Sequence, residues 1–286
     1  AGRIKINAFM LIVFLYVLIV YPIVGSWQWG GGFLSTFTDE VGFYDFAGST
    51  LVHSVGGWGG LVIIYLLGAR KGKFDSSGKA VAIPGSNIPL SAAGVLILWL
   101  GWFGFNGGSV LSADPANTSL VLVTTCLAAA AGGLGASFLS TLMYKNLDIT
   151  MFMNGVLGGL VGITAGADQM GPTSAIIIGA IGGAVVVLGV ALLDKCKLDD
   201  PVGAIPVHLF AGIWGTLAVG LFGASAGFDQ FMVQLASTGI VGVFCVIGAS
   251  IIALIVKSIM GLRVSDEEEE TGLDISEHGT KAYFSS

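Results

Sequence analysis

The sequence predicts an all-α polytopic membrane protein, and three observations support that class. Hydrophobic residues make up 54% of the 286 residues and charged residues only 10%, whereas a soluble domain has about 25% charged residues. Mean hydropathy is +0.88, and apolar runs of roughly twenty residues, the length that crosses a bilayer core, recur along the chain. Basic residues also fall only in alternate connections between those runs, which is typical of a chain that crosses a membrane repeatedly.

Eight apolar runs are expected to be transmembrane helices, because a spanning segment in hydrocarbon must satisfy its backbone hydrogen bonds internally. In chain order they are residues 5–26, 45–68, 90–112, 117–143, 150–167, 174–194, 202–224 and 231–259. The fifth run is short and rich in glycine, so its limits and those of the seventh are the hardest to fix. Residues 1–260 are therefore predicted to form the membrane domain, and residues 261–286 a cytoplasmic tail.

The charged residues between the runs indicate how each run is oriented. Basic residues stand before the first run and after, or at the end of, the second, fourth, sixth and eighth: Arg3, Lys5, Arg70, Lys71, Lys73, Lys79, Lys145, Lys195, Lys197, Lys257, Arg263 and Lys281. The other connections contain acidic residues and no basic ones: Asp39, Glu40, Asp114, Asp168 and Asp229. Since basic loops stay in the cytoplasm, we expect an even number of spans, both termini in the cytoplasm, and a multi-pass protein of the cell membrane.

Several other classes of function have no support in the sequence. The net charge is −6, and much of it comes from one acidic run near the C-terminus, so nucleic-acid binding is not expected. Cys126, Cys196 and Cys245 have no paired or metal-type spacing, and no cofactor is predicted. The first run is long enough to span, and no small-residue cleavage site follows it, so we expect no cleavable signal peptide.

One pattern occurs twice and identifies candidate functional residues inside the membrane. Val-His-x-x-x-Gly-x-x-Gly contains His53 in its first copy and His208 in its second, and Asp45 and Asp200 stand eight residues before them. The flanking charges make the copies antiparallel, which is the signature of an inverted-topology repeat with its site near the midplane. Intramembrane histidines are functional candidates by default. The alternative is that the glycines merely pack helices and that the match is chance. On one continuous helix, Asp45 would lie about 12 Å from His53 along the axis.

Aromatic and polar residues near the outer ends of the first three runs form a second set of candidates. Trp29 is either an interfacial belt residue or a ring presented to a cation. Phe105 and Ser109 are i and i+4 on the third run, so they share a helix face, and this face is either packing or a gate with a hydrogen-bonding hydroxyl. Trp102 belongs to the same aromatic stripe. Asp45 is either a helix cap or an anion that attracts cations.

These residues resemble the ammonium transporter family (Amt/Mep/Rh), on its Amt side, and the resemblance extends over the whole chain. Five segments carry it: WGGG at 29–32, DFAGSTLVH at 45–53, GWFGFNGGS at 101–109, VHLFAGIWG at 207–215 and GLRVSDEEEETGLDISEHGTKAY at 261–283. The resemblance implies transmembrane transport of ammonium or ammonia by a protein that is not an enzyme. It implies a homotrimer in the lipid bilayer, in which each protomer has its own pore. It also implies that the tail couples protomers and meets PII-type signalling proteins at the cytoplasmic face.

The family suggests a role for each candidate residue. Trp29 and Ser109 would bind the ammonium ion in an outer vestibule, and Phe105 would form part of a phenylalanine gate. Asp45 would lie below this recruitment site, with a largely structural part. The pore-lining residues would be the twin histidines and a neighbouring tryptophan: His53, His208 and Trp102.

The chain departs from the family pattern in two respects. Typical members have eleven spans, and this sequence begins at what would be the fourth, so we expect either a fragment or a shortened variant without three helices. One of those three carries the other gate phenylalanine. Around the second histidine, the usual Gly-Val-His-Gly is Pro206-Val207-His208-Leu209, and Gly203 stands where an acidic residue is often found. These changes weaken the transfer of detail near His208.

Two other functions stay open on the sequence. An ammonium sensor acting through a cytoplasmic partner would share the same residues, and a bis-histidine haem protein would also place histidines on facing helices. In the tail, residues 267–270 are four glutamates, a like-charge run of the kind that is normally solvated, so we expect an acidic linker there. Beyond it, Leu273, Ile275 and Tyr283 are candidates for docking on the cytoplasmic face.

Overall fold

The structure, a computed structural model, describes residues 2–38 and 40–283. Asp39, one of the acidic residues assigned to the outer connections, lies outside the described residues. The α-helices are α1 (Ile6–Leu15), α2 (Tyr21–Ser26), α3 (Val55–Leu67), α4 (Ile88–Gly108), α5 (Pro115–Tyr144), α6 (Ile149–Ile163), α7 (Pro172–Lys195), α8 (Ala211–Phe222), α9 (Phe228–Met260), α10 (Asp266–Thr271) and α11 (Leu273–His278). Three π-helical turns complete the longer helices: η1 (Tyr16–Val20), η2 (Ser49–Ser54) and η3 (Ile205–Phe210).

The predicted all-α polytopic class is confirmed. Within the described residues, seven helices are long and apolar enough to cross a membrane: Ile6–Ser26, Ser49–Leu67, Ile88–Gly108, Pro115–Tyr144, Pro172–Lys195, Ile205–Phe222 and Phe228–Met260. The fifth predicted run forms the apolar helix α6, which is shorter at 15 residues. It ends at Ile163, four residues before the predicted limit of 167.

The second helix begins at Ser49 and not at residue 45 as predicted. Gly48, just before it, has a φ of 115°, a left-handed conformation that glycine adopts at no steric cost. Asp45 therefore lies in the irregular segment that precedes the helix carrying His53. The distance of about 12 Å along one continuous helix does not apply to this pair.

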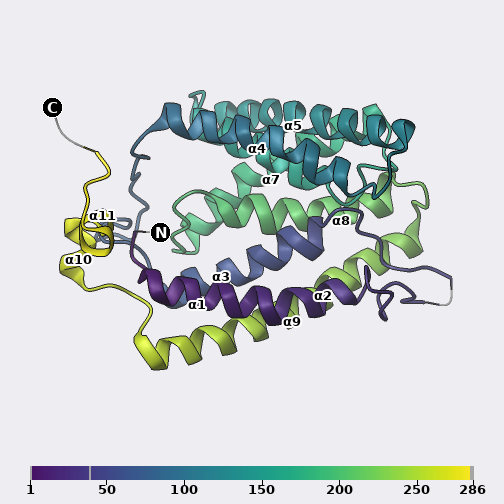
Figure 1. Cartoon of the computed structure of the whole chain (residues 1–286). Coiled ribbons are helices and arrows are strands. Elements are labelled where there is room, and N and C mark those ends of the chain that lie inside the picture. Colours follow the sequence, from purple (N-terminus) through teal and green to yellow (C-terminus); the bar gives the residue numbers. More distant parts are fainter. Residues whose placement is uncertain (1, 39, 284–286) are drawn as a thin grey trace.

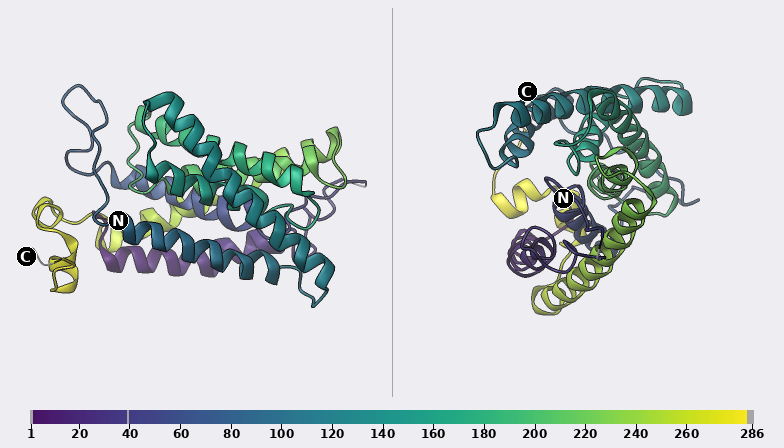
Figure 2. Two further views of the ribbon diagram at one scale, coloured as in Figure 1. Left: turned by 90° about the horizontal axis from the view of Figure 1, so that it is seen from above. Right: turned by 90° about the vertical axis from the view of Figure 1, so that its right-hand side faces the viewer.

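The two helices that follow the histidine turns lie in the middle of the molecule. In Figure 1, α3 and α8 run between a group formed by α1, α2 and α9 and a group formed by α4, α5 and α7. The view from the end in Figure 2 shows the same two groups around them. One buried apolar cluster, around Val20, Val241 and Cys245, joins the first group to the α3 helix, and another, around Leu160 of α6 and Val186 of α7, joins the second group to the α8 helix.

Glycines bring α5, α6 and α7 into close contact. A Cβ atom on Gly132, Gly159 or Gly183 would collide with the backbone of a neighbouring helix in each case. Small residues are what allow the backbones of membrane helices to approach one another. These glycines therefore act in packing, as the simpler interpretation of their abundance predicted.

Side-chain caps explain where three of the helices begin. Asn87, Asp114 and Asp148 each stand just before a helix, and each accepts a hydrogen bond from an N–H group of the first turn at 2.8–2.9 Å. Such caps satisfy donors that the helix itself leaves free.

The first and last segments that the structure describes lie at one end of the bundle. The N-terminus and the tail helices α10 and α11 are neighbours in Figure 1, and an isolated β-bridge joins Ile4 to Arg263. Helix α3 runs toward this end, because the carbonyl of Leu67 accepts a hydrogen bond from Arg263. The helix that begins with η3 runs away from the same end, since Asp199, which precedes η3, pairs there with Arg70 at the end of α3. The two histidine helices are thus antiparallel, as their flanking charges predicted.

Candidate functional site

The two histidines of the repeated pattern lie side by side. The ring centroids of His53 and His208 are 5.2 Å apart with an interplanar angle of 22°, and the two Nδ1 atoms are 3.2 Å apart. Each histidine belongs to a six-residue π-helical turn, η2 or η3. A π-turn is rare and is frequently found at functional sites, and here one occurs at each member of the pair.

The contact between the rings determines what their other nitrogens offer. In a hydrogen bond between two Nδ1 atoms of neutral imidazoles, one ring donates and the other accepts. The donating ring then has an acceptor at Nε2, and the accepting ring has an N–H donor there. In the part of the chain that the structure describes, Nε2 of His53 is buried and has no hydrogen-bond partner. A buried polar atom in that state is available to a small ligand.

The glycines of the pattern let the two histidine turns come this close. A Cβ atom on Gly57 would lie 2.8 Å from the backbone nitrogen of Leu209, and one on Gly212 would collide with the carbonyl of Ser49. The glycine four residues after each histidine therefore makes room for the turn that carries the other. This reciprocity is the structural meaning of the repeat.

Two aromatic rings of α4 pack against His53. Trp102 stacks on it with 5.0 Å between centroids and an angle of 16°, and Phe105 lies 5.7 Å away. The indole Nε1 of Trp102 donates to Oγ1 of Thr164 at 3.0 Å, which fixes the ring. The structure thus brings together four of the sequence-predicted residues: His53, His208, Trp102 and Phe105.

The outer candidates fall into two sets of contacts. Trp29 is 43% exposed, and its indole Nε1 donates to the backbone carbonyl of Asp45 at 2.8 Å. Ser109 is the C-cap of α4 and donates from Oγ to the carbonyl of Phe105 at 2.8 Å. Phe105 connects the second set to the histidine pair, because its ring packs near His53.

Asp45 acts as a cap on the first histidine helix. It is fully buried, and its carboxylate accepts four backbone N–H groups, from Gly48 and Ser49 at one oxygen and from Thr50 and Leu51 at the other, at 2.8–2.9 Å. These are donors that the start of a helix leaves free. Of the two interpretations open on the sequence, this geometry supports the cap. A direct part in attracting cations stays a prediction.

Some residues that support the site were not identified from the sequence. Thr164 accepts the hydrogen bond from the indole of Trp102. A single threonine at the end of an apolar, glycine-rich run has no feature in the sequence that would indicate this role. Tyr16 donates from its hydroxyl to the carbonyl of Val55 at 2.8 Å, two residues after His53. Tyr16 could have been identified from the sequence, because a tyrosine inside an apolar run has a hydroxyl that needs a hydrogen-bond partner.

Charged residues join the two histidine helices at the end of the bundle where the chain termini lie. Asp199, just before η3, accepts two hydrogen bonds from the guanidinium of Arg70, at 2.8 and 2.9 Å. Arg3 lies 3.6 Å from the same carboxylate and donates to the carbonyl of Gly68 at 2.7 Å. Burial by itself raises the pKa of Asp199, but the hydrogen bonds and positive charge of Arg70 outweigh it, so the pKa is lowered.

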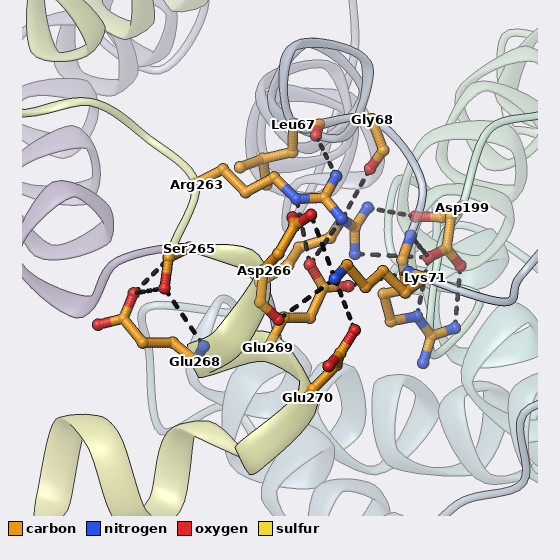
Figure 3. A network of polar contacts seen from close by, with 12 residues as sticks. Leu67, Gly68, Lys71, Asp199, Arg263, Ser265, Asp266, Glu268, Glu269 and Glu270 are labelled. Carbon is orange, nitrogen blue, oxygen red and sulfur yellow. Dashed lines mark hydrogen bonds and ion pairs between the residues drawn. The ribbon is translucent and has the colours of Figure 1, made fainter.

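The tail docks on the same region, as Figure 3 shows. Glu269 accepts from the guanidinium of Arg263 at 2.7 Å and from the N–H of Lys71 at 2.9 Å, and Glu270 pairs with Lys71 at 2.7 Å. Glu268 forms a capping box with Ser265. Burial favours a higher pKa for Glu269, yet these donors lower it overall.

The prediction of an acidic linker is therefore wrong, and that of solvation is wrong for Glu269, whose side chain is 6% exposed, whereas Glu267 and Glu270 are solvent-exposed as predicted. The four glutamates belong to helix α10, because the capping box starts the helix and basic residues at the end of α3 supply partners that the sequence separates by almost two hundred positions. Of the three residues predicted to dock, Leu273 is half-buried, whereas Ile275 and Tyr283 are 38% and 53% exposed.

Seven membrane-length helices, two of them antiparallel and carrying a histidine pair between them, define a multi-pass membrane protein in the part of the chain that the structure describes. The model of the Ammonium Transporter Family matches residues 1–283, and the chain belongs to that family. It is 41% identical over 307 residues to ammonium transporter Amt2 of Archaeoglobus fulgidus, a match that covers 99% of this chain. It is 36% identical over 296 residues to the ammonium transporter of Bacillus subtilis, with the same 99% coverage.

Two solved structures share the fold. The chain superposes on a structure described as a sensor Amt protein with a TM-score of 0.92 and 34% identity, covering 97% of this chain and 71% of that one. For Mep2 of Candida albicans the TM-score is 0.82 and the identity 27%, covering 93% and 61%. The chain spans 65% of the length of the Archaeoglobus relative and 54% and 63% of two relatives from Synechocystis.

Proposed function

We propose that the protein transports ammonium across the membrane, with Trp29, Phe105 and Ser109 as the outer site and the histidine pair as the lining of the pore. The observation that carries this proposal is the contact between His53 and His208, at 3.2 Å between Nδ1 atoms, with a buried and unpartnered Nε2 on His53. Family membership and the names of the relatives support ammonium as the substrate.

The outer site offsets part of the cost of dehydrating the ion. The exposed indole of Trp29 offers a π-face, and a cation over such a face gains about 0.5–2 kcal/mol. The oxygen of Ser109 accepts an N–H of ammonium while its own hydrogen stays on the carbonyl of Phe105. Both groups act at the surface, before the ion passes Phe105.

Beyond Phe105 the surroundings become apolar, which disfavours the charged form of the substrate. Ammonium gives one proton to water, leaving neutral ammonia and a hydronium ion, and ammonia moves along the histidines. Ammonia is both a donor and an acceptor, so it suits a pair of rings whose free nitrogens are one acceptor and one donor. Potassium has no proton to lose, and it stays charged and excluded.

Flux in proteoliposomes tests the proposal. We expect the whole protein to take up methylammonium, ammonium to compete with it, and potassium to have no effect. Replacing Trp29 with leucine is expected to raise the half-saturation concentration, because the cation loses its aromatic face. Absence of uptake by well-folded protein at any concentration would contradict transport.

An ammonium sensor is the second candidate, favoured by the likeness to the structure described as a sensor Amt protein. Sensing predicts that ammonium changes the binding of a cytoplasmic partner, even in a variant that conducts nothing. Measuring flux and partner binding on the same preparation separates the two functions.

A haem protein does not fit the histidine pair. Two nitrogens that bind one metal ion from opposite sides lie about 4 Å apart, at roughly 2 Å per bond. The nearest nitrogens of His53 and His208 are 3.2 Å apart and the rings are stacked. A macrocycle has no place between them.

We also propose that residues 261–286 form a cytoplasmic tail of a homotrimer in the cell membrane and that the tail meets PII-type proteins. The positive-inside rule supports the orientation, because Arg70 and Lys71 lie at the end of the bundle where α10 docks. Cross-linking tests the trimer, and protease access from each side of sealed vesicles tests the orientation of the tail.

A further inference from the structure

Two glutamines of α9 form hydrogen bonds with the backbone of residues 42–48, the segment that leads into the first histidine helix. Gln234 is fully buried. Its Oε1 accepts the N–H of Tyr44 at 2.9 Å, and its Nε2 donates to the carbonyls of Tyr44 at 2.7 Å and Thr216 at 3.0 Å. Gln230, one turn earlier, donates to Oε1 of Gln234 at 3.0 Å and to the carbonyl of Gly42 at 3.1 Å.

These contacts use the whole hydrogen-bonding capacity of Gln234. A carboxamide has two N–H donors and an oxygen with two lone pairs. Here both donors go to carbonyls, and the oxygen receives one N–H from Tyr44 and one from Gln230. Turning the amide over would set N–H against N–H and oxygen against oxygen, so the buried side chain has one stable orientation. It therefore holds Tyr44 at both its N–H and its carbonyl.

Asp45 follows Tyr44 and supports both parts of the proposed site, the outer tryptophan and the histidine pair. The carbonyl of Asp45 anchors the indole of Trp29 at 2.8 Å, and its carboxylate caps the helix that carries His53. The connection between α6 and α7 also contacts this segment, because the N–H of Phe46 donates to the carbonyl of Ala165 at 2.9 Å. On the side of α9, the backbone next to Asp45 is held by Gln234.

We propose that Gln234 is a positioning residue for the outer ammonium site. It does not touch the cation. By fixing Tyr44, it aims the carbonyl of Asp45 at the indole and so keeps the ring of Trp29 where the cation arrives. This inference rests on the proposed function, because it takes the face of Trp29 to be a binding surface.

The test is the concentration dependence of methylammonium uptake by the whole protein. We expect Gln234→Leu to raise the half-saturation concentration about three- to tenfold, the effect of losing one or two buried hydrogen bonds, with a smaller change in the maximal rate. Gln169→Leu is the matched control. Gln169 also holds a loop, by accepting the N–H of Ala224 at 2.7 Å, and among the described residues its side chain makes no hydrogen bond to Tyr44, whose hydroxyl donates to the neighbouring Asp168.

A second variant keeps the inference testable if the leucine variant fails to fold. Gln234→Glu retains the acceptor but loses both donors when ionised, and regains one donor when protonated. We expect its half-saturation concentration, relative to wild type, to approach one at the most acidic pH that the vesicles tolerate and to rise toward neutral pH. An unchanged ratio across that range would overturn the inference, as would wild-type half-saturation in Gln234→Leu.

The tryptophan variant separates this inference from the proposed function. If Trp29→Leu shifts half-saturation and the Gln234 variants do not, the outer site stands and the positioning role of Gln234 is wrong. If Trp29→Leu also leaves half-saturation unchanged, the outer site itself is wrong.

Discussion

The two copies of the histidine pattern share their spacing but differ in how their aspartates are used. Asp45 is fully buried and accepts four backbone N–H groups at 2.8–2.9 Å. Asp200, at the equivalent position, accepts the N–H of Ile205 at 2.7 Å and that of Val202 at 3.4 Å, and it is only half-buried. The same side chain at the same spacing therefore caps one turn completely and the other partly.

The difference comes from what covers each aspartate. The segment around Asp45 is enclosed by Gln234 of α9 and by the connection between α6 and α7. Asp200 lines a cavity of about 490 Å³ at the other end of the bundle, together with Asn154 and Gly203. The comparison teaches that the repeat determines how the histidines meet, while the surroundings determine how completely each aspartate is buried and hydrogen-bonded.

The largest expected effect is the loss of either histidine. His53→Ala and His208→Ala should each reduce ammonium flux about tenfold or more, or abolish selectivity against potassium, because one hydrogen-bonding ring is lost and the other loses its partner. Proteoliposome flux with ammonium and potassium gradients measures both. Wild-type flux and selectivity in both variants would contradict the proposed pore.

Replacing each aspartate with alanine tests directly whether the two caps differ in strength. Asp45→Ala leaves four buried N–H groups without acceptors and should destabilise the protein by about 3 kcal/mol or more. Asp200→Ala removes a weaker cap and should cost about 1 kcal/mol. Thermal unfolding of both variants in detergent, with Asp45→Asn as the control that keeps one acceptor oxygen, measures the difference. Equal losses would mean that the two caps are equivalent after all.

The tail should have a smaller effect, confined to the end of the first histidine helix. Glu269→Gln weakens the contacts with Arg263 and Lys71 and should reduce flux roughly two- to fivefold, since such partly exposed pairs are worth about 0.5–1 kcal/mol. Truncation after Arg263 should leave insertion intact and reduce or deregulate transport. Glu267→Gln is the matched control, because Glu267 is solvent-exposed. Unchanged transport and regulation in the truncation would argue against a role for the tail.

The smallest effect concerns acid. Because the pKa of Asp199 is lowered in the folded protein, its pairing with Arg70 contributes stability above the unfolded pKa, about 3.9, and that contribution is lost as the pH falls through the lower folded value. Asp199→Asn should lower the melting temperature near neutral pH and flatten its fall in strong acid. A parallel pH dependence in variant and wild type would show that this carboxylate is not the titrating group.

Much of the fold could be predicted because membrane helices are constrained one at a time. Length and apolar composition define each span, and alternating basic residues define its direction. The helix boundaries that were wrong lie where these rules stop. The second helix begins at Ser49 because Gly48 has a left-handed backbone conformation and Asp45, four residues before Ser49, caps the helix with its side chain. Neither feature changes the hydrophobic periodicity from which helix limits are predicted.

The sequence by itself determined the class, the family and the two histidines, since spacing and local charge are written along the chain. Only the tertiary structure decided that His53 and His208 meet at their Nδ1 atoms, that Trp102 stacks on His53, and that Gln234 holds the segment before Asp45. It also decided that Glu269 is paired and not solvated. Each of these contacts joins positions far apart in the chain, so its energy depends on packing that no local pattern records.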